Sequence, residues 1–391
     1  MKGAAETATK ARRSARRRGR LPAWIDFGLI PLLNLAAALL VAGLVVLFIG
    51  ENPLDAVQIL VWGALGYGEG IGFTLFYATN FMMTGLAVAV AFHAGLFNIG
   101  GEGQAYVGGL GVGLAALALD RFVPWWVTFP VAIAGGALFG AAWAFIPAWL
   151  QAKRGSHIVI TTIMFNFIAS ALMVYVLVEL LTPQGSMQPE TRTFEAGGQL
   201  PELGWLFTAF GLDIGGAPVN ITLFVALVAC MLVYFVIWRT RLGYEIRAVG
   251  FNPTAAVYAG ISTVKITVIA MLISGALAGV MALNPVMGEQ HRLQIDFVTG
   301  AGFIGIAVAL MGRAHPVGVI FAAILFGILY QGGAELAFEM PAISRDMIIV
   351  IQGLVILFAG ALENMFRPGV TRIYVVVTGP RQVPGQVKAG A

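Results

Sequence analysis

Long apolar stretches, separated by short polar or glycine-rich connections, recur along nearly the whole chain. A stretch of roughly 20 apolar residues is long enough to cross about 30 Å of hydrocarbon as a helix. The alternating ten-residue pattern that a membrane barrel requires is not found, so the backbone groups of the spans must be paired within helices. The pattern predicts an all-α polytopic membrane protein with about ten spans. We place these spans at about residues 27–50, 71–92, 103–119, 125–149, 157–181, 219–238, 264–284, 298–312, 316–334 and 346–366.

The first apolar stretch, IDFGLIPLLNLAAALLVAGLVVLFIGENP, follows a basic tail in the manner of a signal peptide. Its apolar core is longer than the roughly 7–15 residues of a signal h-region, and no clear small-x-small cleavage site follows it. We therefore expect an uncleaved first span.

Composition agrees with this class. Of the 391 residues, 59% are hydrophobic and only 11% are charged, whereas soluble domains usually carry about 25% charged residues. The net charge of +4 does not indicate nucleic acid, because eight of the 23 basic residues lie in the first twenty positions, directly before a span. Such a cluster is typical of contact with anionic lipid headgroups. The single cysteine, Cys230, excludes an intramolecular disulfide and a cysteine metal site, and we predict no metal site.

Charged residues divide between the two sides of the predicted spans. The basic segments are the N-terminus, QAKRGSH (151–157), WRTRLGYEIR (238–247), GRAHP (312–316) and the tail after Arg367. The acidic residues on the other side are Glu51, Asp55, Glu69, Glu190, Glu195, Glu202 and Asp213. Because cytoplasmic connections carry the excess of Lys and Arg, both termini are predicted to be cytoplasmic. The chain then divides into a basic tail (1–26), a transmembrane domain (27–367) and a second tail (368–391).

Two connections are long, and they face opposite sides. Residues 182–218, rich in proline and glycine, are predicted to be external, whereas residues 239–263 are predicted to be cytoplasmic. The second includes GYEIRAVGFNPTAAVYAGI, which is suited to a short surface helix with a docking face. An ordinary connecting loop is the alternative.

One internal match suggests a repeat. Residues 107–141 resemble residues 298–332, with Gly109 opposite Gly300 and Gly111 opposite Gly302. Five predicted spans separate the copies, so the two would run in opposite senses across the membrane. Inverted repeats with short, glycine-interrupted segments point to a transport pathway, although small residues selected for helix packing would give a similar match.

Few polar side chains lie within the spans, and such residues are expensive in lipid and therefore candidates for function. Asn98, Glu102 and Gln104 occur together in GLFNIGGEGQ (95–104), just before a short span. Asn98 in a helix cap and Glu102 in the first turn would be a structural explanation, but a helix that begins at membrane depth also presents unpaired N–H groups to a cavity. Asn80, Asn166 and Asn284 are either interhelical hydrogen-bond partners or ligands.

Known catalytic patterns are missing from the sequence. It contains no G-x-x-x-x-G-K-[ST], H-E-x-x-H, C-x-x-C or G-x-S-x-G motif, so we predict neither an enzyme nor a bound cofactor. The spans also lack the repeated charged residues that drive proton relays. A transporter of this kind must take its energy from a partner.

Four motifs resemble one family of transport proteins. They are AFHAGLFNIGGEGQ (91–104), HIVITTIMFNFIA (157–169), RLGYEIRAVGFNPTAAVYAGI (241–261) and GFIGIAVALMGRAHPVGV (302–319). In this order they are similar to the membrane permease subunits of ABC importers for nucleosides and simple sugars, within the superfamily of ribose and branched-chain amino acid permeases. The resemblance covers roughly residues 30–366, and the NIGGEGQ copy is closest to the nucleoside branch.

The resemblance implies a ten-helix core similar to that of the cobalamin importer permease, in the inner membrane. It implies three partners: a second permease subunit, identical or homologous, an ATPase subunit that uses ATP, and an external substrate-binding protein. It also implies a coupling loop that docks on the ATPase and includes Gly243, Glu245, Arg247, Gly250, Asn252, Ala255, Ala256 and Gly260. An interrupted helix beside the translocation path would include Phe97, Asn98, Glu102 and Gln104, and the path would also offer Asn80, Phe165 and Asn166.

Three alternatives stay open from the sequence. The first is a branched-chain amino acid permease of the same superfamily. The second is a stand-alone secondary transporter, which the lack of membrane-embedded coupling carboxylates disfavours. The third is a structural membrane scaffold, which would leave the internal repeat unexplained.

Overall fold

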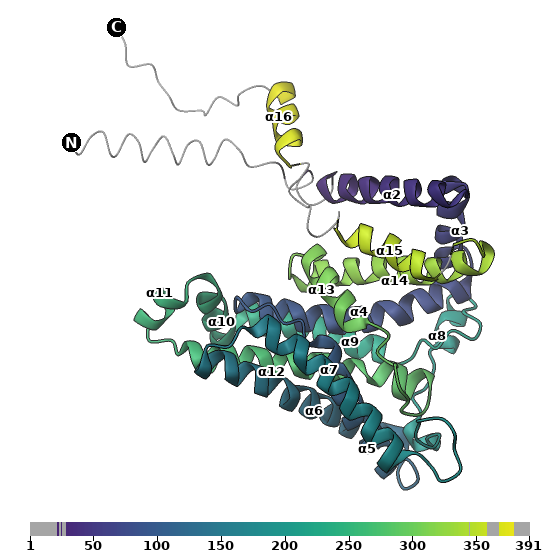
Figure 1. Cartoon of the computed structure of the whole chain (residues 1–391), viewed down its shortest axis with the longest axis vertical. Helices are drawn as coiled ribbons and strands as arrows, with labels where there is room; N and C mark the ends of the chain where they lie inside the picture. The colour runs from purple at the N-terminus through teal and green to yellow at the C-terminus, as the bar shows by residue number, and fades with distance from the viewer. Residues whose placement is uncertain (1–21, 23–24, 26–28, 344, 358–366, 379–391) are drawn as a thin grey trace. The chain divides into compact units, whose positions relative to one another are not determined.

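The computed structural model describes residues 22, 25, 29–343, 345–357 and 367–378 (Figure 1). Among them, regular structure is helical apart from two isolated bridges, Glu190 with Gln294 and Glu202 with Asn220. The predicted all-α class is therefore confirmed. The basic tail 1–26 lies almost entirely outside the described residues, as do residues 379–391.

The helices follow one another in this order: α2 (Ile30–Ile49), α3 (Pro53–Leu65), α4 (Gly68–His93), α5 (Gly101–Leu119), α6 (Trp125–Arg154), α7 (Ile158–Val176) with a π turn (Leu177–Leu181), a 3-10 turn (Ala196–Gly198), α8 (Gly204–Ala209), α9 (Thr222–Arg239), α10 (Arg241–Phe251), α11 (Pro253–Tyr258), α12 (Thr263–Met281), a π turn (Asn284–Glu289), α13 (Ala301–Met311), α14 (Pro316–Glu339), α15 (Arg345–Ile356) and α16 (Arg367–Thr378).

The chain divides into two compact units. The first consists of Met1–Leu54 and Ala342–Ala391, and in it α15 packs against α2. The second, Asp55–Pro341, contains every site described below.

Six of the described helices are each long and apolar enough to cross a membrane. They are α4, α6, α7 with its π turn, α9, α12 with its π turn, and α14. A seventh span results if α2 and α3 are counted as one, whereas α13 is apolar but has only 11 residues. The chain is thus a multi-pass membrane protein.

Helix α3 was not expected, because residues 51–70 are too short and too polar at their ends to predict a span. The 13 residues of α3 nevertheless carry the signals of a helix start, with Pro53 at the first position and Asp55 in the first turn. Its apolar residues Ala56 and Leu60 are buried. An apolar run of this length is sufficient for a short packed helix, but not for a crossing.

Close contacts between glycine backbones hold α5, α6 and α12 together. A Cβ atom added at Gly108 of α5 would lie 2.2 Å from the Cα of Gly279 of α12, and one at Gly279 would lie 2.1 Å from the carbonyl oxygen of Gly136 of α6. Helices pack closely in lipid where small residues meet, because apolar area alone gives no driving force there. These glycines therefore set the spacing of the three helices.

An ion pair between buried Asp120 and partly exposed Arg192 fastens the connection between α7 and α9 to the end of α5. Arg192 donates to both carboxylate oxygens of Asp120, at 2.6 Å to Oδ2 and 2.8 Å to Oδ1, and the backbone N–H of Glu195 donates to Oδ2 at 2.8 Å. Burial alone would raise the pKa of Asp120, but the hydrogen bonds from Arg192 and Glu195 outweigh it and hold that pKa below its usual value. The carboxylate is thus charged throughout the physiological range.

The same connection is also bound to the segment that follows α12. The backbone N–H of Phe194 donates to the carbonyl of His291 at 2.7 Å, and Arg292 forms an ion pair with Glu190 at 2.7 Å. The Phe194 side chain is fully buried. Residues 190–200 are therefore an ordered part of the fold.

We expect Asp120→Asn to lower the unfolding temperature of the purified protein at pH 7, by the equivalent of about 1–3 kcal/mol, because Arg192 keeps only a neutral partner. The lowered pKa of Asp120 makes the contribution of the carboxylate complete above its ordinary pKa of about 3.9, and this contribution is lost as pH falls through the folded-state value. The gap between wild type and variant should be constant from about pH 5 upward and narrow below about pH 4. Thermal unfolding across this range measures it.

The control for this variant is Glu195→Gln. It breaks the exposed pair of Glu195 with Arg121, whose atoms are 3.9 Å apart, so its unfolding temperature should change little. An Asp120→Asn protein that unfolds with wild type at pH 7 would show that the buried pair does not stabilise the fold.

Candidate functional site

The junction between α4 and α5 is held by amide side chains. Asn98 Nδ2 donates to Gln104 Oε1 and to Ser274 Oγ, both at 2.9 Å, and Ser274 Oγ donates to the carbonyl of Ala87 at 2.6 Å. Asn98 Oδ1 accepts from the backbone N–H of Gly100 at 2.9 Å. Both amides and the serine are buried. This cluster therefore links α4, the start of α5 and α12.

Glu102 lies where α5 and α13 begin. Its carboxylate accepts the backbone N–H of Gly300 at 3.0 Å and that of Gly302 at 2.8 Å, and the residue is only 8% exposed. A Cβ atom added at Gly302 would lie 2.2 Å from the backbone nitrogen of Glu102, so the two helix starts are in direct contact. Helix N-termini carry unpaired N–H groups and a partial positive charge. The Glu102 carboxylate accepts hydrogen bonds from such N–H groups and lies beside the positive ends of both helices.

Asn166 of α7 caps α5. Its Oδ1 accepts the backbone N–H of Gly103 at 2.9 Å, and its Nδ2 donates to the carbonyl of Ile99 at 3.0 Å. The expectation that Asn98 is the cap of this helix is wrong, because the N-cap residue is Gly100, which has no side chain to cap the helix. The capping side chain comes from 63 residues further along the chain, a contact that local sequence cannot indicate.

A second buried amide cluster lies at the break between α12 and its π turn. Asn284 Nδ2 donates to Asn80 Oδ1 at 2.9 Å and to the carbonyl of Phe76 at 3.0 Å. Asn284 Oδ1 accepts from Asn220 Nδ2 and from the hydroxyl of Thr222, both at 2.8 Å. Asn80 and Asn284 are therefore interhelical hydrogen-bond partners.

The two aromatic residues expected beside the amides pair with other rings. The ring of Phe97 is 5.3 Å from that of Phe92, and the ring of Phe165 is 5.3 Å from that of Trp143, whose Nε1 donates to the Phe165 carbonyl at 3.3 Å. The seven expected path residues thus fall into separate packed groups. Within the described residues no group of His, Cys, Asp and Glu is suited to a metal ion.

The connection after α9 folds into α10 and α11, and its motif residues shape it from within. Gly243 and Gly250 are the two points of close approach: an added Cβ would lie 2.1 Å from the carbonyl oxygen of Val236 and 2.2 Å from that of His93, respectively. Asn252 caps α11 by accepting the N–H of Ala255 at 3.0 Å. The remaining motif residues are Glu245, paired with Arg241 at 2.9 Å, Arg247, bound to the Gly243 carbonyl at 3.3 Å, Ala256, which is buried, and Gly260, at φ +79°.

Large apolar side chains project from these two helices into solvent. Phe251 is 93% exposed and Tyr258 is 90% exposed, and Tyr244 and Val257 are also exposed. We name these four residues the α10–α11 surface. The motif residues expected to dock do not include these four. Their occurrence in an otherwise polar connection is a signal in the sequence that could have indicated a contact surface.

The α10–α11 segment also contacts the junction that Asn98 holds. Gly95, in the left-handed region at φ +73°, lies so close to α10 that an added Cβ would be 3.2 Å from the Cα of Gly250. His93, at the end of α4, bonds through Nε2 to the carbonyl of Ala314 at 2.9 Å and packs edge-on against Trp238. The backbone of α10 and the α4–α5 junction are thus in direct contact.

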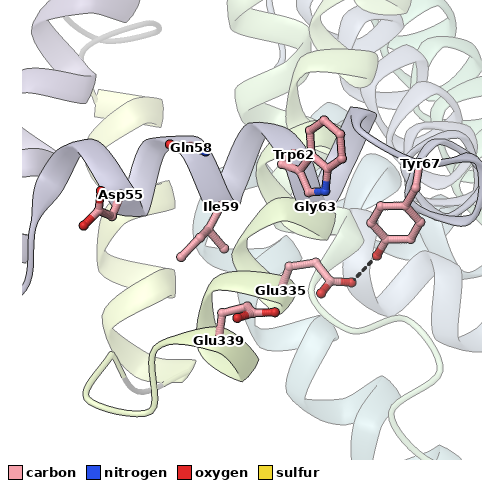
Figure 2. Close-up of a pocket in the computed structure, with 8 residues that line it drawn as sticks. All are labelled: Asp55, Gln58, Ile59, Trp62, Gly63, Tyr67, Glu335 and Glu339. Atoms are coloured by element: carbon pink, nitrogen blue, oxygen red, sulfur yellow. Dashed lines mark hydrogen bonds between the residues drawn. The ribbon is translucent and has the colours of Figure 1, made fainter.

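A pocket of about 590 Å³ lies between α3, Tyr67 and the end of α14 (Figure 2). Its lining includes the carboxylates of Asp55, Glu335 and Glu339, and the Tyr67 hydroxyl donates to Glu335. Burial and this hydrogen bond raise the pKa of Tyr67 to about 12, so the phenol stays protonated. None of the residues predicted for the path lines this pocket.

This geometry is that of a polytopic membrane protein with discontinuous helices and a separate exposed surface on a connection between spans. The chain belongs to the family described as the permease component of the branched-chain amino acid transport system, whose model matches residues 70–360.

Three similar proteins are ABC transporter permeases. The glucose permease protein TsgB13 of Haloferax volcanii is 35% identical over 86% of this chain and 88% of its own length. The guanosine permease protein NupP of Bacillus subtilis is 35% identical over 85% of this chain and 93% of its own. The nucleoside permease protein NupB of Lactococcus lactis is 32% identical over 84% and 90%. The chain is accordingly a permease subunit of an ABC transporter, and the transport role expected from the sequence is confirmed.

Proposed function

We propose that this chain forms the translocation path of an ATP-driven importer for a nucleoside or a related simple sugar. Two of the three relatives are named for guanosine or nucleosides and the third for glucose. The NIGGEGQ stretch (98–104), typical of the nucleoside branch, supports the first substrate class. The chain would act in the cell membrane with a second permease subunit, an ATPase subunit and an external binding protein, and with both termini cytoplasmic.

The proposed arrangement is the ten-helix fold with an inverted repeat, like that of the cobalamin importer permease. The contact of Glu102 with Gly300 and Gly302 supports it, because the repeat would equate α5 with α13, and one carboxylate joins the starts of both. Two helices of opposite sense that begin at one point form the kind of discontinuity found beside transport paths.

One observation carries the mechanism, namely the contact between Gly95 and Gly250. The α10–α11 surface would dock on the ATPase, and a displacement of α10 would then push directly on the α4–α5 junction. Since Asn98 ties this junction to α12, the motion would reach the helices that border the path. ATP hydrolysis in the partner thus switches the side to which the path opens.

We expect Phe251→Ser and Tyr258→Ser together to abolish copurification of the ATPase subunit, because large apolar anchors supply most of the energy at such interfaces. Both side chains are almost fully exposed, so the fold should be retained. Co-expression of this chain with its ATPase subunit and second permease subunit, followed by affinity purification through this chain, is the measurement.

The matched control for docking is Phe338→Ser, which removes an aromatic side chain that is 83% exposed at the end of α14. It should leave the complex intact. If the double variant retained the ATPase at wild-type stoichiometry, the docking assignment would be contradicted. Substrate uptake by cells that express this chain without any ATPase subunit would favour a secondary transporter.

For the path residues, we expect Asn98→Ala to reduce uptake of radiolabelled guanosine at least tenfold in cells that express the whole transporter. The variant leaves the buried Gln104 and the Gly100 N–H without their partner, so the α4–α5 junction loosens. Competition with unlabelled nucleosides, glucose and leucine defines the substrate class. If the Asn98→Ala variant transported guanosine at the wild-type rate, a role of the α4–α5 junction in transport would be excluded. Competition by leucine alone would favour an amino acid permease.

A further inference from the structure

The α8 segment (residues 203–212), within the connection between α7 and α9, has an unusual composition for a loop. Its sequence LGWLFTAFGL has no charged residue and includes three aromatic residues, whereas Glu202 and Asp213 flank it and are exposed. Trp205 is 70% exposed and Phe210 is 82% exposed. Large apolar groups that project from a connection mark a contact surface.

The inner face of the segment is fixed to the ends of two membrane helices. Leu203 and Ile214 belong to a buried cluster that packs against Phe73 of α4 and Leu223 of α9. The backbone carbonyl of Asp213 lies against Gly68, the first residue of α4. The segment is therefore held at the level where α4 and α9 begin.

Several polar groups of the segment are paired within it. The backbone N–H groups of Phe207, Phe210, Gly211 and Leu212 donate to carbonyls of residues 203–208, and the exposed hydroxyl of Thr208 donates to the carbonyl of Gly204 at 2.9 Å. This pairing meets the requirement of a segment in contact with lipid, although threonines of water-exposed helices form the same i−4 bond.

The spans next to the segment also expose apolar side chains. Helix α9, which follows the segment in the chain, exposes Phe224, Val228 and Met231 along its length. Trp126, in the first turn of α6, is 64% exposed at the corresponding end of another span. Aromatic rings are enriched at the headgroup level, where one part of the ring is apolar and another is wet.

We propose that the α8 segment inserts Trp205 and Phe210 into the boundary between headgroups and acyl chains of the outer leaflet. The occupant of this surface is the bilayer itself, with Glu202 and Asp213 on the water side. The connection between α7 and α9 is thereby a membrane-anchored element.

The test uses the full-length chain in lipid nanodiscs with nitroxide labels. Cys230, the single cysteine, is replaced by Ala, and Trp205→Cys, Phe210→Cys and the control Gln188→Cys are each labelled. We expect collisions with oxygen to exceed those with a water-soluble nickel chelate several-fold at 205 and 210, and the reverse at 188, which lies in the exposed part of the same connection.

Nickel collisions as frequent at 205 and 210 as at 188 would overturn the proposal. Suppression of both reagents at 205 and 210 would also overturn it, in favour of a protein that covers this face. A second measurement does not depend on labelled variants: brominated lipids should quench tryptophan fluorescence of the wild type by a larger amount than that of Trp205→Phe. Equal quenching would reject the lipid contact.

Discussion

Gly279→Leu should prevent the chain from reaching a stable folded state. The Cβ of any residue at this position would lie 2.1 Å from the Gly136 carbonyl oxygen and 3.1 Å from the Cα of Gly140, both of which are backbone atoms of α6. Overpacking that only displaces side chains costs about 1–3 kcal/mol, and here the helices themselves must separate. We expect the variant to be degraded in cells, or to elute as aggregate in size-exclusion chromatography after mild detergent extraction.

Gly353→Leu provides the control for this prediction. Gly353 lies inside α15, and a Cβ added there meets no atom within 4 Å. Leucine also favours helix over glycine by roughly 0.5–1 kcal/mol. The control should therefore be expressed at the wild-type level, and a monodisperse Gly279→Leu protein would show that α6 and α12 are further apart than described.

Glu102→Ala should have the second large effect. It leaves the N–H groups of Gly300 and Gly302 buried without an acceptor, at a cost of about 1–3 kcal/mol for each group. Glu102→Gln keeps one acceptor but turns an NH₂ group toward the other N–H, so it should be intermediate. Unfolding temperatures of the purified chain should decrease in the order wild type, Glu102→Gln, Glu102→Ala.

Uptake separates a structural from a transport role at Glu102. If the carboxylate only stabilises the fold, uptake per folded molecule should equal that of wild type, whereas a role in the moving path would reduce uptake per folded Glu102→Gln molecule. Glu69→Ala removes an exposed acid and should change neither quantity. Equal stability of Glu102→Ala and wild type would contradict the bridge between α5 and α13.

Six of the ten spans predicted from the sequence coincide with helices long and apolar enough to cross a membrane, because a run of apolar residues reflects burial in lipid. Helices α4, α6, α7, α9, α12 and α14 each coincide with a predicted span. Helix α3 was missed, because 13 residues satisfy a packed helix without crossing the membrane. The hydrophobic pattern thus indicates which segments are surrounded by lipid, but it does not indicate where a short helix packs.

The site was predictable in its residue types and not in its contacts. Asn98, Glu102 and Gln104 stood out because polar groups in lipid need partners. The partners come from distant parts of the chain: Ser274 for Asn98, Gly300 and Gly302 for Glu102. Separations of 176 to 200 residues leave no periodic signal.

In the connection that forms α10 and α11, the motif residues and the exposed residues differ. Gly243 and Gly250 belong to the motif because the backbone of α10 must approach its neighbours closely there. The side chains that face outward, Phe251 and Tyr258, have few contacts within the chain and are exposed. The motif glycines thus meet a requirement of the fold, and the exposed side chains proposed to dock on the ATPase are other residues of the same two helices.

The contact between Gly95 and Gly250 places the backbone of α10 directly against the α4–α5 junction. Because no side chain lies between the two glycine backbones, a displacement of α10 at this contact cannot be absorbed by a change of side-chain rotamer. A methyl group at Gly250 would lie 2.2 Å from the carbonyl oxygen of His93, so it would force α10 away from the end of α4. If α10 and α11 dock on the ATPase as proposed, this change would weaken the transmission of movement to the membrane helices and leave the exposed docking side chains intact.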